Sequence, residues 1–96
     1  MFDKKRVIKD LCDLNYTFGL FSGRWEEENK MDMAAEEYLE TMRLFADEYK
    51  IEYDKELSHY IEDEEYEAEC YTMMYMADSI YDKVKEKLLT ILGIYN

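Results

Sequence analysis

The scarcity of helix-breaking residues is the feature that most constrains the fold of this chain. It contains no proline, and its three glycines stand at positions 19, 23 and 93. Because proline and glycine are the residues that most often interrupt a helix, the sequence predicts an all-α protein. Its 96 residues predict one domain, residues 1–96, built as a small bundle of three to four helices with a long C-terminal helix. A chain of this length has a small core, which a partner or a second copy often completes.

The spacing of apolar residues places two helices in the first half of the chain. The first is expected to begin near Lys4, with Asp3 as its N-cap, and to end within residues 14–25, where two glycines lie. Its predicted apolar stripe consists of Val7, Ile8, Leu11 and Cys12. The second helix has the clearest amphipathic repeat, with steps of four and three residues between Met31, Ala35, Tyr38, Met42, Phe45 and Tyr49.

Two further helical segments are predicted in the second half. A break near residues 49–55 precedes a short segment that Asp54 caps and whose apolar face is Leu57, Tyr60 and Ile61. A kink or a new helix start is expected at residues 62–65, where acidic residues interrupt that face. The last helix is expected to end at Gly93, and its apolar stripe consists of Tyr66, Cys70, Met73, Ala77, Ile80, Val84 and Leu88.

The first part of this last helix is apolar on nearly every side. Between Cys70 and Ala77 only Thr72 is polar. A helix of this kind is typically buried on several sides. We therefore expect a central helix or a dimer interface here.

The negative charge is concentrated in the middle of the chain. The formal net charge is −12; residues 1–25 carry +2, residues 26–69 carry −14, and residues 70–96 are neutral. Binding to nucleic acid or to an anionic membrane surface requires lysine and arginine, so the sequence argues against both. The acidity favours either a basic partner protein or solubility alone.

The remaining global features indicate a cytoplasmic protein. No apolar run approaches the length of a membrane span, and the basic start, MFDKKRVIKD, lacks the apolar stretch of a secretory signal. Cys12 and Cys70 fit no metal-ligand spacing and are expected to be small buried apolar residues. For a phage-encoded chain, the expected location is the cytoplasm of the host cell.

One group of acids resembles part of an enzyme signature. Glu36, Glu37 and Glu40 form an E-E-x-x-E pattern. This resembles the first half of the signature of MazG-type all-α NTP pyrophosphohydrolases, and the resemblance would cover about residues 35–77. It implies Mg²⁺ held by these acids together with an E-x-x-D pattern on a second helix. No E-x-x-D occurs in this chain; the closest substitutes are Glu62-x-x-Glu65 and Glu64-x-x-Glu67.

Helical geometry also separates these acids from the expected core. At 100° per residue, Glu36 and Glu40 lie opposite the stripe that contains Tyr38 and Met42. A small Mg²⁺-dependent pyrophosphohydrolase is therefore kept as an alternative function. Its predicted metal ligands are Glu36, Glu37, Glu40, Glu64 and Glu67.

Other catalytic chemistry has less support in the sequence. Glu56-x-x-His59 matches the spacing of carboxylate-bridged di-iron bundles, but the chain has a single histidine, so a surface or boundary position is expected for it. The same shortage leaves both cysteines without a base for nucleophilic catalysis. No glycine-rich phosphate loop is present. We expect no cofactor and predict that the protein is not an enzyme.

The acidic residues and the tyrosines together indicate a binding surface. Like charges stand four residues apart at Glu36 and Glu40, and again at Glu65 and Glu69, a spacing that destabilises a helix. The ten tyrosines divide into an expected core set, Tyr38, Tyr49 and Tyr66, and a set expected among the acids, Tyr53, Tyr60 and Tyr81. Exposed tyrosine beside carboxylates suits a surface that binds arginine and lysine.

In length, acidity and tyrosine content, the whole chain resembles small inhibitors made by phages and mobile elements. These include DNA-mimicking anti-restriction proteins and many anti-CRISPR proteins, and the resemblance implies binding in the nucleic-acid channel of a defence effector. The leading hypothesis is a non-enzymatic inhibitor that occupies the nucleic-acid-binding surface of a basic partner protein. A plain helical dimer or subunit is the remaining alternative. The predicted partner-binding residues are Glu36, Glu40, Asp47, Tyr60, Glu62, Asp63, Glu64, Glu65, Glu67 and Glu69.

The acidic run at residues 62–69 is expected to have a second role. Six of these eight residues are acidic. Two or three of them would stabilise the start of the last helix, where carboxylates face the positive end of the helix dipole. Lys83, Lys85 and Lys87 would suit the other end.

Overall fold

The protein is all-α, as its shortage of helix breakers predicts. The computed structural model describes residues 3–24, 31–52, 54–63 and 69–93. Within these residues the chain forms four helices and no strand: α1 (Lys4–Arg24), α2 (Met31–Glu48), α3 (Lys55–Glu62) and α4 (Cys70–Ile91). The predicted long C-terminal helix is confirmed as α4.

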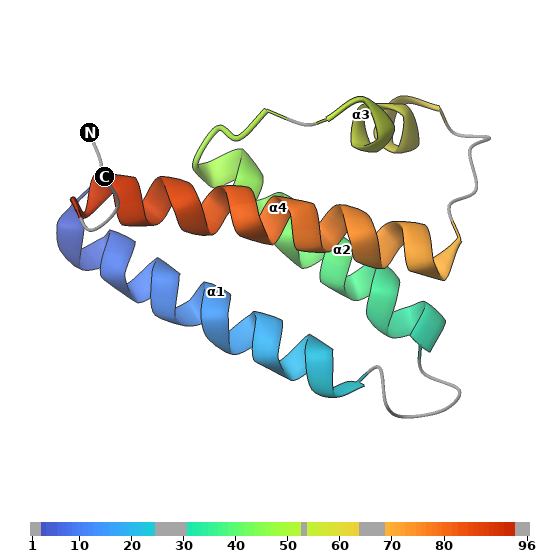
Figure 1. Ribbon diagram of the computed structural model, residues 1–96, viewed down its shortest axis with the longest axis horizontal. Helices are drawn as coiled ribbons and strands as arrows, with labels where there is room; N and C mark the ends of the chain where they lie inside the picture. Colours follow the sequence, from blue (N-terminus) through green and yellow to red (C-terminus); the bar gives the residue numbers. More distant parts are fainter. Residues whose placement is uncertain (1–2, 25–30, 53, 64–68, 94–96) are drawn as a thin grey trace.

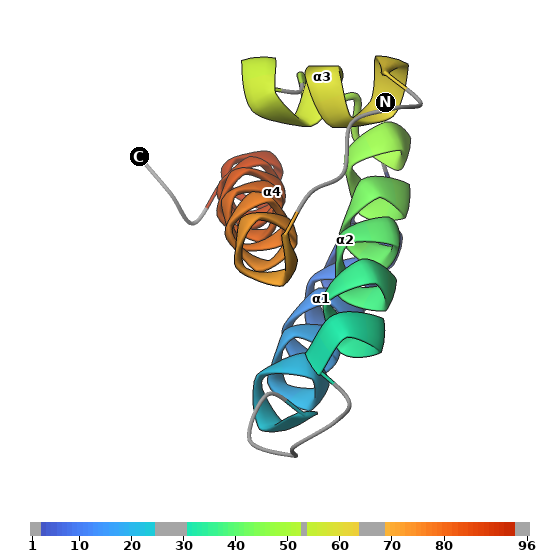
Figure 2. The same ribbon diagram turned by 90° about the vertical axis from the view of Figure 1, so that its right-hand side faces the viewer.

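Three long helices form the body of the molecule, and α3 lies to one side (Figure 1). Helix α1 runs antiparallel to α2 and α4, whereas α2 and α4 run in the same direction and cross. Figure 2 looks nearly along α4 and shows α3 above it and α1 below it in this view. Helices α1 and α2 each pack against α4 and also against each other, so each long helix contacts the other two and α4 is not enclosed by its neighbours.

The ends of the helices are set by residues that the sequence identifies. Asp3 accepts a hydrogen bond from the backbone N–H of Lys5 at 3.1 Å, and Asp54 accepts one from Leu57 at 2.8 Å, so both predicted N-caps are confirmed. The predicted break after α2 includes Lys50, whose φ of 54° lies in the left-handed region. Gly93 ends α4 with a φ of 76°, which favours glycine.

Helix α1 ends at Arg24, within the predicted residues 14–25, after continuing through both of its glycines. Gly19 and Gly23 both lie inside the helix. A glycine inside a helix costs about 1 kcal/mol relative to alanine. Packing on both sides of Gly19 offsets this cost: Phe18 stacks on Tyr81 with ring centroids 4.2 Å apart, and Phe21 stacks on Tyr38 at 5.1 Å.

The core is built from the apolar stripes of the three long helices together with one residue of α3. Its buried members are Val7, Leu14, Phe21, Ala35, Tyr38, Leu39, Met42, Ala46, Tyr49, Leu57, Met76, Ala77, Ile80, Tyr81, Val84 and Leu88. The stripe predicted for the second helix is confirmed at Ala35, Tyr38, Met42 and Tyr49, and Phe45 is half-buried against the core. Leu57 anchors α3, while Tyr60 and Ile61 pack partly against the same core.

A tyrosine hydroxyl links each pair of long helices. Tyr38 of α2 donates to Asp78 of α4 at 2.7 Å, and Tyr49, directly after α2, donates to Asp10 of α1 at 2.5 Å. Tyr81 of α4 donates to the side-chain oxygen of Asn15 of α1 at 2.5 Å. These buried rings thus satisfy their polar ends at the rim of the core, which also fixes how the helices align.

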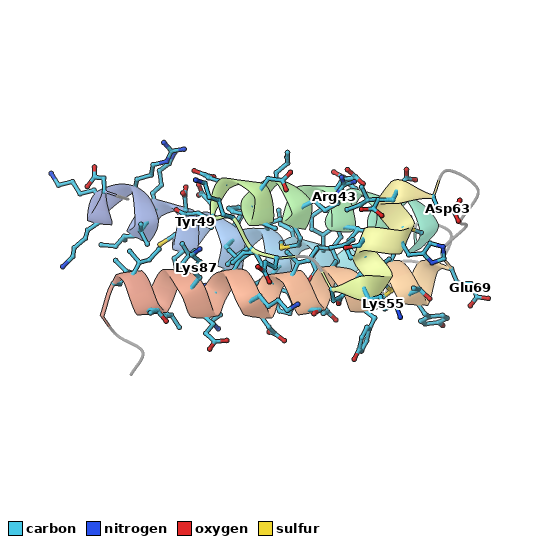
Figure 3. The ribbon with its side chains drawn as sticks, turned by 90° about the horizontal axis from the view of Figure 1, so that it is seen from above. Arg43, Tyr49, Lys55, Asp63, Glu69 and Lys87 are labelled. Atoms are coloured by element: carbon cyan, nitrogen blue, oxygen red, sulfur yellow. The ribbon has the colours of Figure 1, made fainter. Side chains whose placement is uncertain are left out.

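The same junction supplies a partner for the end of α2. Lys87 of α4 donates through Nζ to the backbone carbonyl of Tyr49 at 2.6 Å, and Figure 3 shows the two residues side by side. A lysine at this place satisfies a carbonyl that the helix itself leaves without a partner. The sequence suggested that Lys87 would serve the end of α4, but this hydrogen bond serves the end of α2.

Half of the stripe predicted for α1 is wrong. Val7 is buried and Leu11 packs against the core, but Ile8 is 51% exposed and Cys12 is exposed. The residues that α1 buries follow the heptad Val7, Leu11, Leu14, Phe18 and Phe21. Ile8 and Cys12 lie one position further round the helix, beyond the reach of α2 and α4. Cys12 is therefore not the buried apolar residue that its type suggested.

Three expectations for the second half of the chain also change. The last helix begins at Cys70, after Glu69 as N-cap, so the expected helical position of Tyr66 lies outside the described residues. Tyr81, expected among the acids, is buried because its ring stacks on Phe18. The expectation that residues 70–77 are buried on all sides is wrong for the single chain, because Tyr71 and Tyr75 are 70% and 72% exposed.

Candidate partner-binding face

The acids predicted on α2 lie on its solvent side. Glu36, Glu37, Glu40 and Asp47 are all exposed, while Tyr38, Leu39 and Met42 between them are buried. The helical prediction that Glu36 and Glu40 face away from the core is therefore confirmed. Asp47 stands eleven residues after Glu36, which separates them by about 16 Å along the helix. It belongs to the same side of α2 but not to the same local group.

Tyr60 of α3 lies near two of these acids, Glu36 and Glu40. Its side chain is half-buried against the core. Burial raises the pKa of its phenol, and the nearby carboxylates of Glu40 and then Glu36 raise it further, while Arg43 lowers it. The structure thus brings Glu36, Glu40 and Tyr60 together from two helices. We call this group, together with Glu37 and Glu62, which are exposed on the same two helices, the α2–α3 acidic face.

Some of this negative charge is balanced inside the molecule. Arg43 of α2 pairs with Glu40 at 2.8 Å, one turn earlier on the same helix. His59 pairs with Asp63 at 3.1 Å, and both side chains are largely exposed, as expected for a surface histidine. An ion pair of this exposed kind contributes little to stability. Its main effect here is to reduce the field of Glu40 and, when His59 is protonated, that of Asp63.

The acidic run from Glu62 to Glu69 is described only at its two ends. Glu62 and Asp63 close α3, and Glu69 is the N-cap of α4 without a side-chain capping bond. Asp63 and Glu69 lie at the same end of the molecule (Figure 3). The predicted binding residues Glu64, Glu65 and Glu67 lie outside the described residues.

In the described part of this run, the expected dipole role applies to Glu69 alone, which is the N-cap at the positive end of α4. The first turn of α4 contains no acidic residue. Glu62 instead stands in the last turn of α3, where a carboxylate meets the negative end of the helix dipole. An unfavourable charge kept at such a position has no role in stabilising α3.

The alternative metal site is not assembled by the described residues. Among residues 3–24, 31–52, 54–63 and 69–93, no three histidine, cysteine, aspartate or glutamate side chains converge on a point where a metal ion could bind. Glu36, Glu37 and Glu40 therefore do not form such a group by themselves. The other two predicted ligands, Glu64 and Glu67, lie outside the described residues.

A second candidate surface was not predicted from the sequence. Tyr71, Tyr75, Asp78 and Asp82 of α4 are exposed and follow one another in steps of four, three and four residues, so they share one side of the helix. We call them the α4 tyrosine–aspartate face. Tyr75, Asp78, Ser79 and Asp82 line an open hollow of about 220 Å³. The sequence does contain a signal for this face. The row of tyrosines continues into Asp78 and Asp82, and a side of a helix that ends in two aspartates is not buried along its whole length.

Comparisons with known proteins give this chain no relative. No protein-family model matches it, no curated protein matches it, and no solved structure matches its fold. Within the part of the chain that the structure describes, no helix has the length and apolar character needed to cross a membrane.

Proposed function

We propose that this protein is a non-enzymatic inhibitor that binds the nucleic-acid-binding surface of a basic partner protein. The observation that carries the proposal is the α2–α3 acidic face, where Glu36 and Glu40 lie near the half-buried Tyr60 and Glu37 and Glu62 are exposed on the same two helices. The acids come from two helices that the core holds in place through Leu39 and Leu57. Such a face presents carboxylates at fixed positions, in the way that a nucleic acid presents phosphates.

The distribution of charge supports a basic partner in particular. The chain carries −12 overall, and the segment that contains this face carries −14. A field of this sign attracts lysine- and arginine-rich surfaces and repels nucleic acid and anionic lipid. It also speeds the encounter with the partner and makes it sensitive to salt. The small inhibitors of phages and mobile elements that the sequence resembles would have this mode of binding.

Affinity capture followed by competition tests the proposal. The tagged protein is used to capture proteins from its native cell at about 0.1 M and about 1 M NaCl, where charges are screened beyond about 10 Å and about 3 Å respectively. We expect a basic protein that is captured only at low salt. Added DNA or RNA should then release it, because both ligands compete for one surface.

Two triple charge-reversal variants with the same net charge provide the matched control. The variant Glu36→Lys/Glu37→Lys/Glu62→Lys changes the net charge from −12 to −6, and Asp13→Lys/Glu52→Lys/Glu86→Lys makes the same change at exposed acids elsewhere. We expect the first to abolish capture and the second to weaken it only. Equal loss in both variants would contradict a localised face. Magnesium-dependent release of pyrophosphate from a nucleoside triphosphate would contradict the non-enzymatic assignment.

A further inference from the structure

The α4 tyrosine–aspartate face exposes more aromatic surface than any other described part of the chain. Tyr71 and Tyr75 are 70% and 72% exposed and stand one turn apart. Asp78 and Asp82 continue the same row over the next two turns. The whole row spans about 16 Å of helix. Two neighbouring tyrosines that the described part of the chain leaves uncovered on a surface helix are typical anchors of a protein interface.

The carboxylates on this face have no cationic partner in the described part of the chain. Asp82 makes no ion pair there, and Asp78 accepts its hydrogen bond from the neutral hydroxyl of Tyr38. The two aspartates stand four residues apart, a spacing at which like charges destabilise a helix by about 0.2–0.5 kcal/mol. Lys85, about one turn after Asp82, lies instead over the ring of Tyr81, 5.6 Å from its centroid.

We propose that this face is the site where an arginine side chain of the basic partner is bound. The guanidinium would lie in the hollow lined by Tyr75, Asp78, Ser79 and Asp82, flat against the tyrosine ring and within reach of a carboxylate. A planar cation with five N–H donors can stack on an aromatic ring and bind a carboxylate at the same time, which a lysine ammonium does less well. The inference rests on the proposed function, because it assumes a basic partner.

Charge complementarity selects this occupant over the other candidates. A nucleic acid or an anionic membrane would bring negative charge to Asp78 and Asp82. A second copy of the chain would bring another net −12 toward a side of α4 that is itself acidic. An arginine-rich surface supplies the opposite charge and also covers the two exposed rings.

Titration with short cationic peptides tests the inference even before the partner is identified. The probes are octa-arginine and octalysine, and the affinity is measured by calorimetry while backbone NMR signals map the contact. We expect octa-arginine to bind more tightly and to shift the signals of residues 71–82 most strongly. The variant Tyr71→Ala/Tyr75→Ala should weaken binding about five- to tenfold. Asp82→Asn should weaken it about threefold.

The matched control is Tyr16→Ala on α1, where the tyrosine is 69% exposed but lies on the basic part of the chain. It should leave the affinity unchanged, and circular dichroism should show native helicity in every variant. Equal affinity of the double variant and the unchanged protein would overturn the inference, as would equal affinity for the two peptides. A dimer detected by light scattering and abolished by Tyr71→Ala/Tyr75→Ala would assign the face to a second copy instead.

The two proposals fail in different ways. If the captured partner is displaced by nucleic acid but binds the Tyr71→Ala/Tyr75→Ala variant normally, the proposed function is supported and the proposed arginine site is contradicted. If octa-arginine binding depends on both tyrosines but no captured protein is released by nucleic acid, the proposed arginine site is supported and the proposed function is contradicted.

Discussion

The two sides of α4 use the same residue types for opposite purposes. On the inner side, Tyr81 stacks on Phe18 and donates its hydroxyl to Asn15. On the outer side, Tyr71 and Tyr75 expose more than two thirds of their surface, at 70% and 72%. Asp78 lies at the boundary, because it is exposed and yet accepts the hydroxyl of the buried Tyr38.

The difference shows what decides the role of a tyrosine in a protein this small. A ring that reaches the core and finds an acceptor at its rim contributes both apolar burial and alignment of the helices. A ring on the outer row contributes neither. The comparison assigns the buried, inner tyrosines (Tyr38, Tyr49 and Tyr81) to the stability of the fold. It assigns the exposed, outer tyrosines (Tyr71 and Tyr75) to binding, and each assignment can be tested separately.

The largest expected effect comes from truncating an inner ring. Tyr38→Ala should lower the free energy of unfolding by about 3–5 kcal/mol, because it leaves a cavity between Phe18, Phe21 and α4. The outer counterpart, Tyr75→Ala, should change it by less than about 0.5 kcal/mol. Urea denaturation followed by circular dichroism measures both. Similar losses of unfolding free energy in Tyr38→Ala and Tyr75→Ala would contradict the distinction between inner and outer tyrosines.

Alkaline pH should destabilise the fold through Tyr38 and Tyr49, whose rings are buried in the core. Burial, and then the hydrogen bonds to Asp78 and Asp10, raise the pKa of Tyr38 and of Tyr49 above the ordinary value of 10.0. A pKa that is raised in the folded state gives stability that is complete below the unfolded value and is lost as the pH rises above it. The free energy of unfolding should therefore be nearly constant from about pH 8 to 9 and fall above about pH 10.

The control for this pH dependence is the variant Tyr38→Phe/Tyr49→Phe. It removes both hydroxyls and keeps both rings, so its free energy of unfolding should fall less steeply above about pH 10. The same steepness in the variant and the unchanged protein would place the alkaline transition on other groups.

Removing a single inner hydroxyl should have a smaller effect. Tyr49→Phe and Tyr81→Phe each lose one hydrogen bond between helices and should lower the free energy of unfolding by about 1 kcal/mol. Tyr71→Phe on the outer row should leave it unchanged within error. Thermal or urea unfolding of the three variants side by side measures the difference. A loss in Tyr71→Phe equal to that in Tyr81→Phe would contradict the comparison.

The smallest expected effect on stability comes from the exposed charges. Glu40→Gln breaks the pair with Arg43, and the free energy of unfolding should change by less than about 1 kcal/mol. The same change should slow association with a basic protein at low salt, because it removes part of the field. Stopped-flow measurement at about 0.1 M NaCl tests this. An unchanged association rate would show that Glu40 is outside the contact.

Much of the fold could be read from the sequence because local chemistry determines it. The absence of proline, the repeat from Ala35 to Tyr49, the caps at Asp3 and Asp54 and the stop at Gly93 all act within one or two helical turns. These features are confirmed. The start of α4 at Cys70 was harder to predict, because the acidic residues before it suit several local structures.

The side of a helix that is covered depends on contacts between helices, and here the sequence was a weaker guide. Ile8 and Cys12 are as apolar as Val7 and Leu11, so only the positions of α2 and α4 decide which pair is buried. Tyr71, Tyr75 and Tyr81 are identical in type, and a partner for the hydroxyl of Tyr81 exists only because α1 brings Asn15 to it. The α4 tyrosine–aspartate face escaped prediction for the same reason.

The most direct test of the division between inner and outer tyrosines measures stability and binding in the same two variants. For Tyr49→Phe, we predict a loss of about 1 kcal/mol in the free energy of unfolding and an unchanged affinity for octa-arginine. For Tyr75→Ala, we predict the reverse: unchanged stability and an affinity reduced about three- to fivefold. Stability and affinity that change together in both variants, or an affinity that is the same in both, would contradict this division.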